Sequence, residues 1–196
     1  MREAFPELAQ RVKLSRTTIN NVLKKHRLNG YKREQKTWKF FRAKRQNELW
    51  QIDLKGGFIL HGKKHWFLVV IDDYSRYLLL THHFDHVPTT QEIFDLLLPL
   101  IERHRPKSIL SDNGSQFRKT WERLCKQYGM KPLFAHPYYP QDKGKVERAI
   151  RNINQEFIYQ LKKFPEWISK LDEYVALFNE IRFHRGINTM PAALFT

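Results

Sequence analysis

The sequence predicts an α/β fold, in which helices cover a mixed β-sheet. Short apolar stretches rich in Ile, Leu, Val and Trp follow one another after residue 48 and are separated by turn residues, as strands are. Longer stretches with apolar residues three and four positions apart alternate with the later strands, as amphipathic helices do. The chain has 196 residues, 41% of them hydrophobic, which is enough for one main core with a small appendage.

Five strands are predicted in this sheet. The first three are adjacent in sequence, and turn signals between them indicate an antiparallel meander. The turn signals are Gly56, Gly57, Gly62 and the Ser75-Arg76 step. The predicted strands cover residues 49–54, 65–73, 76–83, 108–111 and 131–135.

The helices are predicted between and after the later strands. Ile93, Leu97 and Ile101 belong to an apolar stripe that would pack against the sheet, and three further helices follow. The resulting order, β-β-β-α-β-α-β-α, is a compact layered α/β arrangement. The later helices are predicted over residues 116–128, 141–164 and 165–183.

The chain is strongly basic, which favours a polyanionic partner. Lys and Arg number 35 against 20 acids, giving a formal net charge of +15, so nucleic acid is the expected partner. No apolar run approaches the roughly 18 residues of a membrane-spanning helix, and no signal peptide is recognised. We therefore expect an intracellular protein without a membrane partner. The one cysteine, Cys125, excludes an intramolecular disulfide and a Cys-rich zinc site.

Residues 1–28 are predicted to form a helix-turn-helix DNA-binding segment. Residues 6–13 and 16–27 have helical periodicity, and Ser15 is a suitable N-cap for the second helix. That helix presents polar and basic side chains suited to base edges and phosphates. They are Arg16, Thr17, Asn20, Asn21 and Lys24. An ordinary surface pair of helices with incidental basic residues is the alternative.

Residues 29–48 are predicted to be a basic linker. Counting from residue 1 to residue 48, Lys and Arg number 14 against 4 acids, so this quarter of the chain carries +10 of the total charge. Aromatic residues such as Trp38 and Phe40 are interleaved with the basic ones. The segment either tracks a DNA backbone or connects two parts of the chain while its aromatic side chains pack on the core.

Two aspartates stand on apolar strands, where a lone carboxylate is costly unless it is paired or binds a metal. Asp53 lies in the first strand and Asp112 follows the fourth, so the two would approach each other if these strands are neighbours. With Glu147, on the helix predicted over residues 141–164, they would provide oxygen ligands suited to two Mg²⁺ ions. Asp72 and Asp73, in contrast, are predicted to have turn or salt-bridge roles.

Four segments, in order, resemble the signature blocks of the DDE integrase core, which retroviral integrases share with bacterial insertion-sequence transposases. Glu147 follows Asp112 by 35 positions, as the family's last spacing requires. The resemblance runs from about Asn47 to the end of the chain. The four segments are residues 47–53 (NELWQID), 70–76 (VIDDYSR), 111–117 (SDNGSQF) and 139–148 (YPQDKGKVER).

The resemblance implies an RNase H-like fold over residues 49–196, including a C-terminal helix and tail. It implies that Asp53, Asp112 and Glu147 are the catalytic residues and the ligands of Mg²⁺ or Mn²⁺, with two ions per site. The basic residues expected near the DNA are Lys143, Lys145, Arg148 and Arg151. Residues of this helix and tail are expected to have packing and capping roles: Asn179, Arg182, His184 and Arg185.

The function implied is a transposase or integrase that cleaves the ends of a mobile element and transfers a strand into target DNA. A homo-oligomer, at least a dimer, is expected on DNA, in the cytoplasm of a bacterium or archaeon and associated with the nucleoid. Two alternatives stay open. The chain is either an RNase H-like nuclease or resolvase that stops at hydrolysis, or an inactive DNA-binding relic of a transposase.

Overall fold

The structure, a computed structural model, describes residues 15–26, 28, 42–60, 62–136, 143–161 and 163–195. Its contacts divide the chain into two compact units, Met1–Phe40 and Phe41–Thr196. The helix predicted over residues 6–13 lies outside the described residues, as do most of the predicted linker and residues 137–142. Residues 42–48, at the end of the predicted linker, belong to the second unit.

The described part of the first unit is the helix α2, Arg16–Lys25. Ser15 caps it as predicted, because its hydroxyl oxygen accepts a hydrogen bond from the backbone N–H of Thr18 at 3.1 Å. Lys24 and Lys25 lie in the last turn, where positive charge is favoured by the helix dipole. No residue of α2 is buried.

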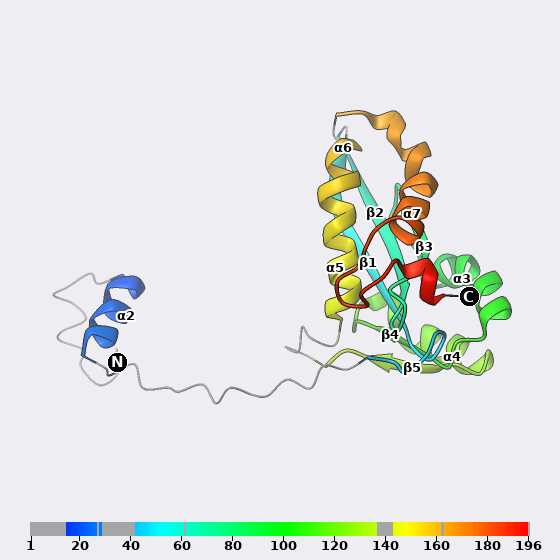
Figure 1. Cartoon of the computed structure of the whole chain (residues 1–196), viewed down its shortest axis with the longest axis horizontal. Helices are drawn as coiled ribbons and strands as arrows, with labels where there is room; N and C mark the ends of the chain where they lie inside the picture. Colours follow the sequence, from blue (N-terminus) through cyan, green and yellow to red (C-terminus); the bar gives the residue numbers. More distant parts are fainter. Residues whose placement is uncertain are drawn as a thin grey trace. The chain divides into compact units, whose positions relative to one another are not determined.

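The second unit is built on a five-stranded sheet with the order β3-β2-β1-β4-β5 (Figure 1). The first three strands are antiparallel, and β4 and β5 continue the sheet in parallel with β1. The antiparallel meander is therefore confirmed, and the first and fourth strands are neighbours, which is the condition for Asp53 and Asp112 to approach each other. The strands are β1 (Trp50–Leu60), β2 (Lys63–Asp72), β3 (Leu78–Phe84), β4 (Ser108–Ser111) and β5 (Lys131–Phe134).

Strand β1 is longer than predicted, since Gly56 and Gly57 lie within it and do not form a turn. A Cβ atom at Gly56 would stand 1.8 Å from the ring of Trp66 in the neighbouring strand, so the position requires glycine. The register shifts between Gly56 and Phe58, and Gly57 has a φ of 81°, as a β-bulge allows. Gly62, with a φ of 79°, lies in the turn between β1 and β2 as expected.

The helices lie close to their predicted positions, but several begin or continue in other geometries. The helix predicted over residues 116–128 begins with a separate 3₁₀ turn, Ser115–Phe117, and the helix predicted over 141–164 contains a π-helical segment, Asn154–Ile158. Further 3₁₀ segments cover Pro165–Lys170 and Pro191–Leu194. The helices are α3 (Thr90–His104), α4 (Lys119–Gln127), α5 (Gly144–Ile153), α6 (Tyr159–Leu161) and α7 (Leu171–Glu180).

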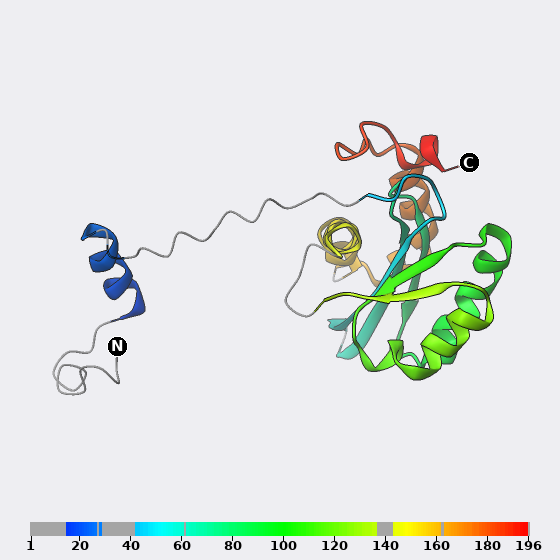
Figure 2. The same ribbon diagram turned by 90° about the horizontal axis from the view of Figure 1, so that it is seen from below.

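Alternating side chains give the sheet two packed faces. In β2, Leu68 and Val70 join a core with residues of α3 and α4, whereas Phe67 and Val69 join a core with residues of α5 and α7. Figure 2 shows these helices on opposite sides of the sheet. Among the residues described, no helix has the length and apolar character needed to cross a membrane.

Asn179 fastens α7 to the sheet. Its side-chain oxygen accepts from the backbone N–H of Leu78 at 2.8 Å, and its side-chain nitrogen donates to the carbonyl of the same residue at 3.0 Å. Asn179 is buried, so these bonds replace the water it would otherwise contact. The predicted packing role of Asn179 is confirmed.

The substitution Gly56→Ala is expected to lower the free energy of unfolding by at least about 2 kcal/mol, because the ring of Trp66, which packs against the core, must be displaced. Gly144→Ala is the control, since a Cβ there meets no atom within 4 Å, and a change within about 1 kcal/mol is expected. Urea denaturation followed by circular dichroism measures both. Equal stability of the two variants would contradict the close approach at Gly56.

Candidate active site

The parallel pairing of β1 and β4 brings two of the predicted carboxylates to the same end of the sheet. Gln51 pairs with Leu110, and the same register continued by two residues places Asp53 beside Asp112. The Asp53 side chain is 16% exposed, whereas that of Asp112 is 46% exposed because it follows the last residue of its strand. One carboxylate is therefore set within the sheet and the other at its rim.

A lysine from the start of α5 joins these two aspartates. The Lys143 Nζ atom lies 2.6 Å from Asp53 Oδ1 and 3.8 Å from Asp112 Oδ2. Lys143 is only 6% exposed, so its ammonium group is withdrawn from solvent and held by the carboxylates. A single positive charge thus stands between two residues predicted to bind metal.

Glu147 lies in the first turn of α5 and is exposed. It follows Lys143 by four positions, and its backbone N–H donates to the Lys143 carbonyl at 3.0 Å, so the two side chains share a side of the helix. Within the described ranges, no group of three or more His, Cys, Asp or Glu side chains is arranged to hold a metal ion. The structure therefore gathers Asp53 and Asp112 around one cation and leaves Glu147 outside a three-acid cluster.

The turn after β4 fixes the orientation of the Asp112 carboxylate. The backbone N–H of Gly114 donates to Asp112 Oδ1 at 2.8 Å, and a Cβ atom at Gly114 would lie only 2.8 Å from the same oxygen. Asn113 Nδ2 donates to the carbonyl of Ala135 at 3.0 Å, which joins this turn to the end of β5. The chain bends at Asn113, and the backbone N–H of Gly114 then holds Asp112 directly.

Asp73 ties α5 to the strands that carry the aspartates. Its buried carboxylate accepts from the backbone N–H of Ala43 at 2.7 Å, from Gln51 Nε2 at 2.8 Å, and from Lys145 Nζ at 2.5 and 2.6 Å. Gln51 Oε1 in turn accepts from the backbone N–H of Val146 at 3.2 Å. The salt-bridge role predicted for Asp73 is confirmed. Its partners Gln51 and Lys145 each precede a predicted ligand, Asp53 or Glu147, by two positions.

Burial dominates the ionisation of this network. It lowers the pKa of Lys145 to about 8, although the hydrogen bond and the charge of Asp73 oppose that change. Burial also raises the pKa of the neighbouring Asp72, against hydrogen bonds from Ser75 and Asn47. Burial makes the charged forms of Lys145 and Asp72 unfavourable, and this cost is offset only while their hydrogen-bond and ion-pair partners stay in place.

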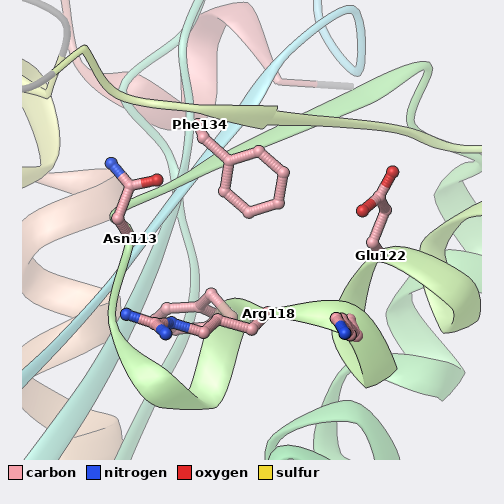
Figure 3. Close-up of a pocket in the computed structure, with 6 residues that line it drawn as sticks. Asn113, Arg118, Glu122 and Phe134 are labelled. Atoms are coloured by element: carbon pink, nitrogen blue, oxygen red, sulfur yellow. The ribbon is translucent and has the colours of Figure 1, made fainter.

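A pocket of about 310 Å³ opens next to Asp112. Figure 3 shows Phe134 on one side of it, with Asn113, Arg118 and Glu122 around the rim. No sequence pattern predicted this pocket, and the one signal for it is the pair of basic residues, Arg118 and Lys119, directly after the segment 111–117. The lining residues are Asn113, Phe117, Arg118, Lys119, Glu122 and Phe134.

The residues predicted to contact DNA have three different settings. Arg148 and Arg151 are exposed on α5, whereas Lys143 and Lys145 are held in the ion pairs described above. The predicted contacts of the first unit are exposed on their own helix: Arg16, Thr17, Asn20, Asn21 and Lys24.

Two family models, both described as the integrase core domain, match the chain at residues 43–140, half of its length, and at residues 128–191. The chain belongs to the integrase core domain family. Its mixed five-stranded sheet with flanking helices is the fold of the integrase catalytic core. The RNase H-like fold predicted from the four segments is thereby confirmed.

Curated relatives come from mobile elements of two kinds. The transposase for transposon Tn552 of Staphylococcus aureus is 27% identical over 146 residues, which are 66% of this chain and 30% of the transposase. The Gag-Pro-Pol polyprotein of squirrel monkey retrovirus is 31% identical over 109 residues, 53% of this chain and 5% of the polyprotein. The chain thus spans less than a third of the length of either relative.

A solved structure of the HTLV-2 integrase catalytic core domain, in complex with magnesium and in a dimeric form, has the same fold. The match has a TM-score of 0.63 at 19% identity and covers 78% of this chain and 99% of that domain.

The substitution Asp73→Ala is expected to lower the free energy of unfolding by about 3–5 kcal/mol, because it leaves Lys145 buried beside Arg76 without its carboxylate. Glu173→Ala removes the exposed partner of Lys170 and is expected to cost less than about 1 kcal/mol. Urea unfolding at pH 7 measures both variants. A loss for Asp73→Ala no larger than that of the surface control would contradict the anchoring role.

Proposed function

We propose that this chain cleaves DNA at the ends of a mobile element and joins the freed 3′-hydroxyl to target DNA. The observation that carries the proposal is the meeting of Asp53 and Asp112, from neighbouring parallel strands, around one cation at the start of α5. Membership of the integrase core domain family supports the reaction class, and the net charge of +15 supports a polyanionic substrate.

The donor set fits a divalent ion. Asp53 and Asp112 provide hard oxygen ligands, and the position of the Lys143 ammonium group beside both of them supports a cation site there. We assign Asp53, Asp112 and Glu147 as the ligands of two Mg²⁺ or Mn²⁺ ions, consistent with the magnesium complex of the HTLV-2 core domain. When bound, such ions activate the attacking oxygen and stabilise the leaving oxygen of an in-line displacement.

The chain's own residues set the positions of these ligands. Asp53 is held by its place within β1, and Asp112 is held by the N–H of Gly114. Gln51 fixes the backbone of Val146, the residue before Glu147, so the third carboxylate starts from an anchored helical turn. Catalytic groups held on rigid elements need little reorganisation when the DNA arrives.

We infer that DNA passes across this end of the sheet. The exposed Arg148 and Arg151 of α5 neutralise phosphates, and Arg118 and Lys119 do the same beside the pocket next to Asp112. Phe134 offers that pocket a ring on which an unpaired base stacks. In this proposal, residues 1–28 recognise the element ends, and residues 29–48 connect them to the core.

Joining both ends of an element requires two active sites, so we propose a homo-oligomer on DNA, at least a dimer. The HTLV-2 core domain, described in a dimeric form, is a precedent from the same fold. Its place of action in this proposal is the bacterial or archaeal nucleoid, where element ends and target DNA lie together.

The substitutions Asp53→Asn, Asp112→Asn and Glu147→Gln are each expected to lower strand joining by at least about a hundredfold, because each removes a charged oxygen ligand. The assay incubates the full chain with labelled element ends, a target plasmid and Mg²⁺ or Mn²⁺, and separates joined from cleaved products. Glu173→Gln, a change of an exposed acid on α7, is the control and is expected to retain activity.

Three outcomes of this assay decide the function. Joined products lost in the three variants support the proposal. Cleavage without joining assigns the chain to nucleases or resolvases instead. Binding of DNA without any metal-dependent product, in the wild type and the variants alike, identifies a relic that has lost catalysis.

The double substitution Arg148→Gln with Arg151→Gln is expected to weaken DNA binding and to reduce the slope of log affinity against log salt by about 1.8, as two lost phosphate contacts require. The pair Arg16→Gln with Lys24→Gln tests α2 in the same way. Fluorescence anisotropy with a labelled duplex over a range of salt concentrations measures the slopes. Lys126→Gln, which changes an exposed ion pair on α4, is the control. If one of the double variants has the same slope as this control, the helix that it changes, α5 or α2, is not part of the interface.

A further inference from the structure

Lys143 is one of the few charged side chains that the second unit buries. Lysine carries a compact, strongly hydrated charge, so it is withdrawn from water only where opposite charge compensates. Here the compensation comes from Asp53 and Asp112, the two carboxylates proposed above as metal ligands. The inference below rests on that proposed metal site.

We propose that Lys143 is a resident cation of the active site, which occupies the place between Asp53 and Asp112 until a divalent ion displaces it. In the ion-free protein its ammonium group offsets the repulsion between the two carboxylates. When the site is filled, Lys143 leaves Asp53, and its ammonium group becomes available for the DNA contact proposed above.

The distances favour exchange over coexistence. The ammonium nitrogen lies 2.6 Å from Asp53 Oδ1, so it occupies one of the two oxygens through which Asp53 would hold a divalent ion at about 2.1 Å. Two cations on one side of one carboxylate oxygen repel each other strongly at such separations. Lys143 therefore competes with the ion for the oxygen and is not a spectator beside it.

The position of Lys143 on the chain allows it to leave without unfolding α5. It precedes the first residue of the helix, and its neighbour Gly144 has no atom within 4 Å of the place where a Cβ would stand. The four-carbon side chain can change rotamer while the backbone of Val146 stays bonded to Gln51.

Lys145, two residues further on, has the opposite character. Its ammonium group bonds both oxygens of Asp73, a carboxylate that is fully buried and shared with Gln51 and Ala43. Asp112, in contrast, is 46% exposed, so an ion from solvent can reach the Lys143 pair from that side. Of these two buried ion pairs, only that of Lys143 is open to exchange.

The test measures Mn²⁺ binding to the full chain without DNA, by isothermal titration calorimetry at one fixed pH and ionic strength. Lys143→Gln is expected to bind Mn²⁺ at least about tenfold more tightly than the wild type, because no ammonium group has to be displaced. Lys143→Arg retains the competing charge and is expected to bind no more tightly than the wild type. Lys126→Gln, which changes an exposed pair, is the control and leaves the affinity unchanged.

A second readout is the thermal midpoint with and without Mn²⁺. Without the ion, Lys143→Gln is expected to melt below the wild type because two carboxylates face each other, and with the ion it is expected to gain more than the wild type does. Circular dichroism at low temperature verifies that the variant is folded. A variant that gains no more than the wild type overturns the displacement.

Asp53→Asn, alone and combined with Lys143→Gln, separates the two proposals. Loss of Mn²⁺ binding in both backgrounds locates the ion at Asp53. If Asp53→Asn abolishes binding while Lys143→Gln equals the wild type, the metal site stands and the role of Lys143 is overturned. If Asp53→Asn has no effect on binding, the metal site itself fails, and the inference about Lys143 falls with it.

Discussion

The carboxylate of Asp73 is the buried charge on which the catalytic end of this sheet depends. It accepts hydrogen bonds from the loop before β1, from Gln51 within β1 and from Lys145 on α5, and it lies itself just after β2. An uncompensated buried charge is costly, so the three segments gain stability only when all of them are in place. The position of α5 is thereby coupled to the formation of the sheet, and Glu147 is carried into position by that coupling.

Lys143 and Lys145, two positions apart at the start of α5, form ion pairs with different roles. Lys145 belongs to the scaffold, because its partner is fully buried and is shared with other donors. Lys143 belongs to the proposed metal site, because its partners are the carboxylates proposed above as ligands. The same residue type, two positions apart, therefore acts once as a structural anchor and once as an occupant of the site. Burial and the partner's other hydrogen bonds decide which role each lysine takes.

The sequence predicted those features that depend on local pattern. Asp53 and Asp112 were found because an acid on an apolar strand is unusual, and the pairing of β1 with β4 then brought them together. Gly56 and Gly57 were misread as a turn because glycine also serves a bulge and a close approach, and only the position of Trp66 distinguishes these uses. The Asp73–Lys145 pair joins residues 72 positions apart, so no periodicity reveals it. The position of Lys143 between the aspartates was not predicted either, because the resemblance of segment 139–148 implied a contact with DNA.

One lysine can balance the charge of this site in the absence of DNA, but it cannot balance the charge present during the proposed reaction. Asp53, Asp112 and Glu147 carry three negative charges, and a DNA phosphate entering the site adds a fourth, so a single ammonium group leaves most of that charge uncompensated. Two divalent ions held by the proposed ligands would provide four positive charges, which would balance the charge of the loaded site. In the structure, the Lys143 ammonium group contacts both Asp53 and Asp112 and offsets much of their repulsion, while Glu147 is exposed. Lys143 therefore matches the charge of the site before DNA and ions arrive, and the arrival of both makes its departure favourable.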